Sequence, residues 1–161
     1  MPLNKAGLKA LGRRIGNPAW LCFSWFGMTA GISLLESPAR FTAGVLSRTA
    51  ALDLGRVVFA LLNKVELIAL VLLLVLVRVS GNTRRFWGEC ALLTLILIAQ
   101  SAWLLPELSA RAQQIVAGAE PSASIAHGAY AVLELAKLVT LLVLGFRALG
   151  MNRNSSSLSQ Q

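Results

Sequence analysis

Four apolar stretches, each long enough to cross a lipid bilayer, constrain the fold of this chain more than any other feature. A transmembrane helix needs about 20 mainly apolar residues. The four stretches cover about residues 17–35, 54–77, 86–105 and 126–149. In the second, residues 67–77 are all Leu, Val, Ile or Ala, and the absence of turn signals over this length favours a helix over a strand. We therefore expect an all-α fold, a four-helix transmembrane bundle.

The composition supports a membrane protein with short polar ends. The chain is 56% hydrophobic and 14% charged, whereas soluble domains carry about 25% charged residues. We expect residues 1–16 to form a basic cytoplasmic head, residues 17–149 the membrane domain, and residues 150–161 a disordered polar tail. The head and the first stretch also resemble a signal peptide. That stretch is too long for one and three more follow, so we expect it to be retained.

The placement of Lys and Arg predicts the orientation. With the N-terminus in the cytoplasm, nine of the fifteen lie on the cytoplasmic side and four on the outer side. Because cytoplasmic connections carry an excess of Lys and Arg, both termini should be cytoplasmic. The Ala-, Leu- and Arg-rich composition suggests a bacterial inner membrane. The net charge of +8 then reflects topology and contact with anionic lipid heads. Nucleic-acid binding is not expected, since no basic patch has interleaved aromatic residues.

Polar and ionisable residues follow one face of the second and fourth stretches. On the second they are Arg56, Asn63 and Glu66, and on the fourth they are His127, Tyr130, Glu134 and Lys137. The spacings of three, four and seven keep each set on one side of a helix. Ionisable groups inside a bilayer are costly, so they usually face a partner, a cavity or a ligand. Matching the two stretches by depth predicts a Glu66–Lys137 ion pair and an Asn63–Glu134 hydrogen bond.

The remaining two stretches bring further polar residues to the same level. Gln100 and Glu107 share a stripe on the third stretch, and Glu36 ends the first. Lys64 lies about 160° around its helix from Glu66, so it should face elsewhere. The candidate ligand- or ion-binding residues are Glu36, Arg56, Asn63, Glu66, Gln100, Glu107, His127, Tyr130, Glu134 and Lys137. Polar residues in spans also serve only to hold helices together, and both interpretations stay open.

Local signals at three further places admit more than one structure. Residues 37–53 are compatible with an interfacial helix, an outward extension of the second span, or an irregular loop. Pro106 should end the third span. Gly27 and Gly31 form a GxxxG, which permits a homo-oligomer or close packing within the chain. The four Trp residues are typical of membrane interfaces.

Enzyme motifs are missing from the sequence. There is no GxSxG, HExxH, Walker loop or dinucleotide fingerprint, so no catalytic residue is predicted. One histidine and two separated cysteines, Cys22 and Cys90, make no metal site. The cofactor is unknown. The first hypothesis is a membrane protein that binds or passes a small ligand or ion. The second is a non-catalytic partner of a larger membrane complex, and the third is a haem- or quinone-linked oxidoreductase-like protein.

Three segments together resemble a known family. They are Glu36-Ser37-Pro38-Ala39-Arg40-Phe41, the run Gly55-Arg56-Val57-Val58-Phe59 leading to Asn63 and Glu66, and the stretch from Gln100 through Leu105-Pro106-Glu107-Leu108 to Arg111. Over about residues 20–149 they resemble small four-helix membrane proteins of unknown function that are similar to the cisplatin-resistance-associated transmembrane proteins. A more distant likeness is to the anthrone-oxygenase-like membrane family. The resemblance implies a fold and no reaction, and the Glu134–Lys137 pair matches neither pattern.

Overall fold

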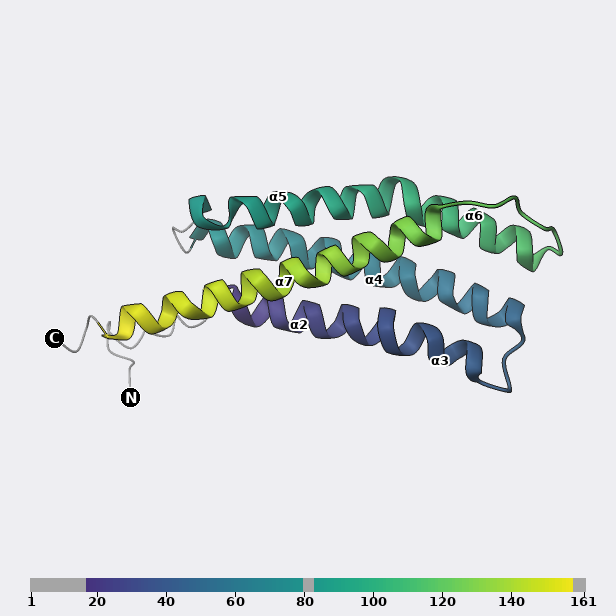
Figure 1. Ribbon diagram of the computed structural model, residues 1–161, viewed down its shortest axis with the longest axis horizontal. Helices are drawn as coiled ribbons and strands as arrows, with labels where there is room; N and C mark the ends of the chain where they lie inside the picture. Colours follow the sequence, from purple (N-terminus) through teal and green to yellow (C-terminus); the bar gives the residue numbers. More distant parts are fainter. Residues whose placement is uncertain (1–16, 80–82, 158–161) are drawn as a thin grey trace, which may run out of the picture.

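The computed structural model describes residues 17–79 and 83–157, with side chains for 17–79 and 84–150. These residues are helical apart from short connections, and no strand occurs among them. The helices form four rods that lie along one long axis (Figure 1). The predicted all-α class is therefore confirmed. The predicted basic head, residues 1–16, lies outside the described part of the chain.

Two of the rods are interrupted by π-helical segments. The first rod consists of α2 (Ala19–Ala30), the π segment η1 (Gly31–Glu36) and α3 (Ser37–Thr42). The third consists of α5 (Thr83–Ala99), the π segment η2 (Gln100–Leu104) and α6 (Leu105–Val116). The second and fourth rods are single helices, α4 (Arg48–Val79) and α7 (Ala126–Ser157).

Each π segment is followed two residues later by a proline. Pro38 lies at the start of α3 and Pro106 at the start of α6. Pro106 does not end the helix, which continues to Val116. A proline inside a helix removes one hydrogen bond and clashes with the carbonyl four residues earlier. In a π turn the bonds run between residues five apart, so the backbone ahead of the proline already departs from the α pattern.

The ends of the rods extend beyond the predicted spans. Of the three structures considered for residues 37–53, the outward extension is observed, since α3 continues to Thr42 and α4 already begins at Arg48. Only residues 43–47 are non-helical between them. At the opposite end of the molecule, α7 is helical to Ser157. It thus continues past residue 150, where we expected a disordered tail to begin.

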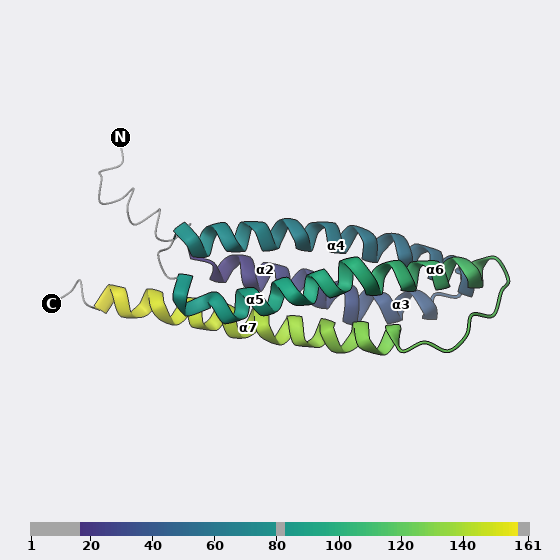
Figure 2. The ribbon, with the colours of Figure 1, turned by 90° about the horizontal axis from the view of Figure 1, so that it is seen from above.

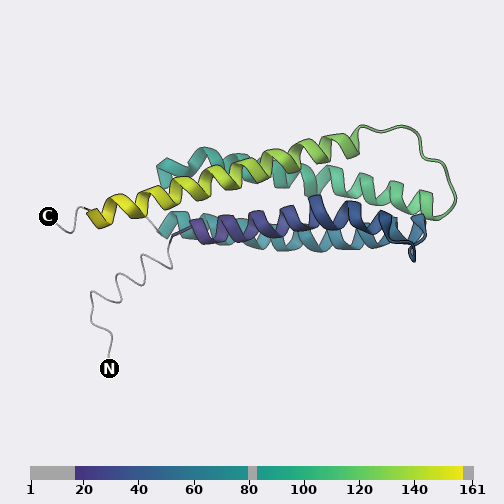
Figure 3. The ribbon, with the colours of Figure 1, turned by 60° about the horizontal axis from the view of Figure 1, so that its bottom comes forward.

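Neighbouring rods alternate in direction. α2 packs against α4 and α7, while α5 packs against the same two helices from the other side (Figures 2 and 3). The described chain begins and ends at one end of the long axis, where Asn17 Nδ2 donates a hydrogen bond to the Ala148 carbonyl (3.3 Å). This arrangement lets every rod contribute side chains to the axis of the molecule.

The surface of the rods is apolar. Three helical segments are long and apolar enough to cross a membrane: Arg48–Val79, Arg84–Val116 and Ala126–Gly150. Only 28% to 44% of the apolar window of each is buried. Exposed large apolar side chains include Leu61, Val65, Ile68, Leu95, Ile98, Val132, Leu135 and Val139. A soluble protein rarely exposes so much contiguous apolar area, whereas hydrocarbon chains would cover it.

The interior has three layers along the long axis. The largest layer, which we call the inner core, lies toward the end that holds Asn17 and includes Leu73, Phe86, Leu93, Leu141 and Leu144. A smaller outer cluster contains Leu104, Ala126 and Tyr130, with Phe59 packed against them. On α4, α7 and the third rod, buried polar residues lie between these two apolar layers, and they form the candidate site.

Candidate functional site

Lys137 lies at the centre of a buried group of three charges contributed by two rods, α4 and α7. Its Nζ is 2.7 Å and 2.8 Å from the two carboxylate oxygens of Glu66, and 2.9 Å from Glu134 Oε2. The Lys137 and Glu66 side chains are 0% and 1% exposed, and that of Glu134 is 5% exposed. The predicted Glu66–Lys137 ion pair is therefore confirmed.

Gln100, the first residue of η2, joins the same charges through its amide. Gln100 Oε1 accepts a hydrogen bond from Lys137 Nζ (3.1 Å), and Gln100 Nε2 donates to Glu134 Oε2 (2.8 Å). Because the ammonium can only donate, the amide oxygen must face Lys137 and the amide nitrogen must face Glu134. The orientation of this amide thus follows from its neighbours.

The first rod supplies three more donors. Trp25 Nε1 and Thr29 Oγ1 donate to Glu66 Oε1 at 3.1 Å and 2.8 Å. Ser33 Oγ, in η1, donates to Glu134 Oε1 at 2.6 Å. The expectation that Trp25 is an interfacial residue is wrong, since its side chain is buried. The repeat of polar residues every four positions was the sequence signal for this stripe. We call Trp25, Thr29, Ser33, Glu66, Gln100, Glu134 and Lys137 the polar network.

Asn63 belongs to a separate polar pair one turn from Glu66. Its side chain donates to Ser101 Oγ (2.9 Å) and accepts from the same hydroxyl (3.1 Å). The predicted Asn63–Glu134 hydrogen bond is therefore wrong. Matching α4 and α7 by depth left out the third rod, whose Gln100 reaches Glu134 instead. Lys64, on the same helix, is exposed as its helical angle indicated.

Tyr130 and His127 lie outward of the polar network on α7. Tyr130 is buried in the outer cluster, and its ring meets that of Phe59 edge-on with centroids 5.7 Å apart. His127 is exposed and stands ten residues before Lys137, which is about 15 Å along a helix. Neither residue joins the polar network among the contacts of the described chain.

The remaining candidates form separate polar contacts. Glu36 pairs with Arg40 (2.8 Å), and Arg56 pairs with Asp53 (2.8 Å). Glu107 accepts a hydrogen bond from Ser124 (2.6 Å), in the connection that precedes α7. The expected convergence of ten residues on one site is therefore limited to Glu66, Gln100, Glu134 and Lys137.

Arg40 is a buried cation that we did not predict. Its side chain is 3% exposed, its guanidinium lies 5.5 Å from the centroid of the Phe59 ring, and a Cβ at Gly55 would overlap its Nη1. Glycine at position 55 therefore allows this close approach to α4. Nη2 bonds Glu36, while Nε and Nη1 have no hydrogen-bond partner in the described chain.

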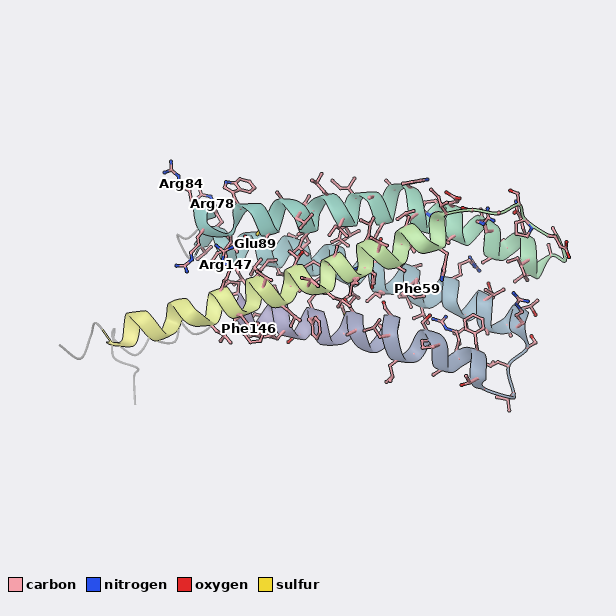
Figure 4. The ribbon with its side chains drawn as sticks, viewed as in Figure 1. Phe59, Arg78, Arg84, Glu89, Phe146 and Arg147 are labelled. Atoms are coloured by element: carbon pink, nitrogen blue, oxygen red, sulfur yellow. The ribbon has the colours of Figure 1, made fainter. Side chains whose placement is uncertain are left out.

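The opposite end of the molecule is rich in arginine. Figure 4 shows Arg78, Arg84, Arg147 and Glu89 together at that end, with Phe59 lying far from them along the molecule. Arg147 forms an ion pair with Glu89 and also lies over the Phe86 ring, 5.8 Å from its centroid. These contacts join α7 to α5. A shallow apolar hollow of about 480 Å³ lies nearby between α4 and α5.

The two GxxxG glycines lie on an open surface of the first rod. Gly27 and Gly31 are exposed, and a Cβ at either position would meet no atom within 4 Å. Of the two sequence interpretations, close packing within the chain is therefore not observed. The homo-oligomer stays a prediction.

The polar network carries more negative than positive groups. Glu66 and Glu134 supply two carboxylates and Lys137 one ammonium, which leaves one formal negative charge. No cluster of three or more His, Cys, Asp or Glu side chains able to hold a metal occurs in the described part of the chain. Cys22 and Cys90 are free and buried in the inner core. The network is therefore an ion cluster with one carboxylate in excess.

Comparison with known proteins adds no assignment. No protein-family model, curated protein or solved structure matches this chain. The family resemblance noted in the sequence stays an expectation.

Proposed function

We propose that this protein is an integral membrane protein that crosses a bacterial inner membrane four times and binds a small cation at the polar network. Three segments are long and apolar enough to span, and the first rod, Ala19–Thr42, is continuous enough to supply the fourth. The rods together would form a transmembrane four-helix bundle. The distribution of Lys and Arg supports cytoplasmic termini, with the polar network in the outer half of the bilayer.

The main support for this proposal is the unbalanced charge of the polar network. Two carboxylates and one ammonium lie together with side chains at most 5% exposed. A buried charge without a partner is costly in a medium of low dielectric constant. One bound cation would make the network neutral. Its removal would restore the unpaired charge, so occupancy should affect the stability of the folded protein.

The apolar layers on either side of the polar network favour cation binding over cation passage. The inner core packs Leu73, Leu93 and Leu141 directly behind the polar network, and all three are fully buried. A cation moving inward would have to cross this apolar layer. We therefore propose that the polar network is a binding site whose cation exchanges with one side of the membrane only. It is not part of a conduction path.

The test is thermal unfolding of the full chain in lipid nanodiscs. Melting temperatures are measured between pH 5 and 9 and in Na⁺, K⁺ or a bulky organic cation. A ligand at 100 times its dissociation constant stabilises by about 2.7 kcal/mol, which is roughly 5–10 °C for a chain of this size. Above about pH 5, carboxyls of the unfolded chain hold few protons, so a proton bound only in the folded state raises the melting temperature as pH falls.

Two variants complete this test. Glu134→Gln makes the polar network neutral and should lose the cation dependence. Asp53→Asn makes the same chemical change at an exposed carboxylate and should keep it. A wild-type protein whose melting temperature responds to no cation, or a Glu134→Gln variant that responds as the wild type does, would refute the proposal.

A second function is supported by the hydrogen bonding of the network. Lys137 Nζ has three acceptor groups, and both polar atoms of Gln100 are bonded. A network so well satisfied can serve only to set how the four rods pack, as in a non-catalytic partner of a larger membrane complex. In that case Glu134→Gln lowers stability by the same amount under every ionic condition, and the wild type shows no cation dependence.

A further inference from the structure

We propose that the cation is a proton and that it is carried on Glu134 Oε1, facing the Ser33 hydroxyl. This inference rests on the proposed function and specifies the ion and the atom that holds it. The hydrogen-bond partners of each carboxylate oxygen in the polar network support this assignment.

The space around the carboxylates excludes an alkali ion. Na⁺ and K⁺ need several oxygen ligands, as hard cations generally do. Here the carboxylate oxygens already accept hydrogen bonds from an indole, an amide, two hydroxyls and an ammonium. An alkali ion would have to displace Lys137 from the centre of the network. A proton needs only one lone pair and one acceptor.

Three of the four carboxylate oxygens are unsuited to holding a proton. Both oxygens of Glu66 lie within 2.8 Å of Lys137 Nζ, and Oε1 also accepts from the Trp25 indole. Glu134 Oε2 accepts from Lys137 and from the Gln100 amide nitrogen. Ammonium, indole N–H and amide N–H groups can only donate. A proton on these oxygens would therefore face a donor and lose an existing bond. The Thr29 hydroxyl, which could accept a hydrogen bond, also faces Glu66 Oε1. That oxygen is already bonded to Trp25 and Lys137, which can only donate.

Glu134 Oε1 differs because its partner can reverse. Its hydrogen bond in this structure comes from Ser33 Oγ at 2.6 Å, and a hydroxyl can accept as well as donate. When Glu134 is protonated, its O–H donates to Ser33 Oγ. The serine hydroxyl then turns to a backbone carbonyl of the preceding turn, a bond that serines in helices often make. One O–H bond of a hydronium ion breaks and one O–H bond forms on Glu134, water is released, and the network loses its excess negative charge. The hydrogen bond that Ser33 donated to Glu134 is replaced by the one that it now accepts.

Ser33 differs from the other polar residues around Glu134 in its exposure. It is only half-buried, whereas Glu66, Gln100, Glu134 and Lys137 are buried. It lies in η1, and π segments often mark functional positions in helices. The charged groups that face Glu134 are Glu66 from α4 and Lys137 from α7, with Gln100 of η2 and Tyr130 of α7 as neutral neighbours.

The test is infrared difference spectroscopy of the full chain in lipid bilayers between pH 5 and 9. We expect a protonated-carboxyl band that appears as pH falls in the wild type and is lost in Glu134→Gln. In Ser33→Ala the band should persist but move to higher frequency, because the protonated carboxyl loses its acceptor. This variant changes a half-buried hydroxyl only, so it keeps the test informative if a glutamine variant does not fold.

The outcomes separate the two proposals. A band that survives Glu134→Gln, or that Ser33→Ala leaves unmoved, overturns the assignment to Glu134 Oε1. If no band appears but Na⁺ or K⁺ raises the melting temperature of the wild type, the proton assignment fails and the cation site stands. If neither response is seen, both proposals fail.

Discussion

Replacement of Lys137 by Met tests whether the ammonium holds the polar network together. The substitution keeps a long, flexible side chain of similar volume and removes the only cation of the network. It leaves the carboxylates of Glu66 and Glu134 without a counter-charge and Gln100 Oε1 without its donor. Removing one partner of a buried ion pair costs about 3–5 kcal/mol, so we expect a loss of that size.

The free energy of unfolding is measured by detergent-induced unfolding in mixed micelles, with far-ultraviolet circular dichroism as the readout. Lys64→Met is the matched control, because Lys64 is exposed on α4, and it should change stability by no more than about 0.5 kcal/mol. Adding Glu66→Gln and Glu134→Gln to Lys137→Met removes the unpaired charges and should recover much of the loss. The reasoning is refuted if Lys137→Met is as stable as Lys64→Met, or if the triple variant recovers nothing.

Three further predictions concern single contacts and topology. Trp25→Phe removes the indole donor to Glu66 and should cost about 1.5–3 kcal/mol by the same unfolding assay, whereas Trp103→Phe, at an exposed position, should be nearly neutral. Gly55→Ala must push the neighbouring guanidinium aside and should cost about 1–3 kcal/mol, while Gly88→Ala, with open space around it, should stabilise by about 0.5–1 kcal/mol. A cysteine at Ser124 should react with a membrane-impermeant thiol reagent in intact cells, and labelling only after lysis would contradict the proposed topology.

The sequence predicted the Glu66–Lys137 ion pair, whose two residues lie on uninterrupted helices. Between Glu66 and the ends of α4 the helix is regular, and the same holds for Lys137 on α7, so counting residues matched their depth correctly. Matching depth predicted the wrong partner where a side chain of a third helix is nearer. Asn63 is the example, because its partner is Ser101. Residue counting gives depth along an axis and does not say which neighbour is nearest around it.

The first rod was missed for a different reason. Trp is usually an interfacial residue in membrane proteins, and hydroxyls such as Thr29 carry little signal because they are common in spans. The π segments were not predictable from hydropathy, since their residues are as apolar as those of a regular helix. Ser33 therefore could be assigned to Glu134 only when the backbone was known.

Each π segment changes the angular position, around the helix axis, of all the side chains that follow it in the rod. In an α-helix each residue advances the side chain by about 100° around the axis, so one residue too many in a turn rotates everything beyond it by that amount. Deleting one residue from Gly31–Glu36 would restore the regular phase and turn α3 so that Arg40 points away from α4. Insertions and deletions of single residues at these two places would therefore redirect a whole face of the outer segment while leaving the inner half of the molecule unchanged.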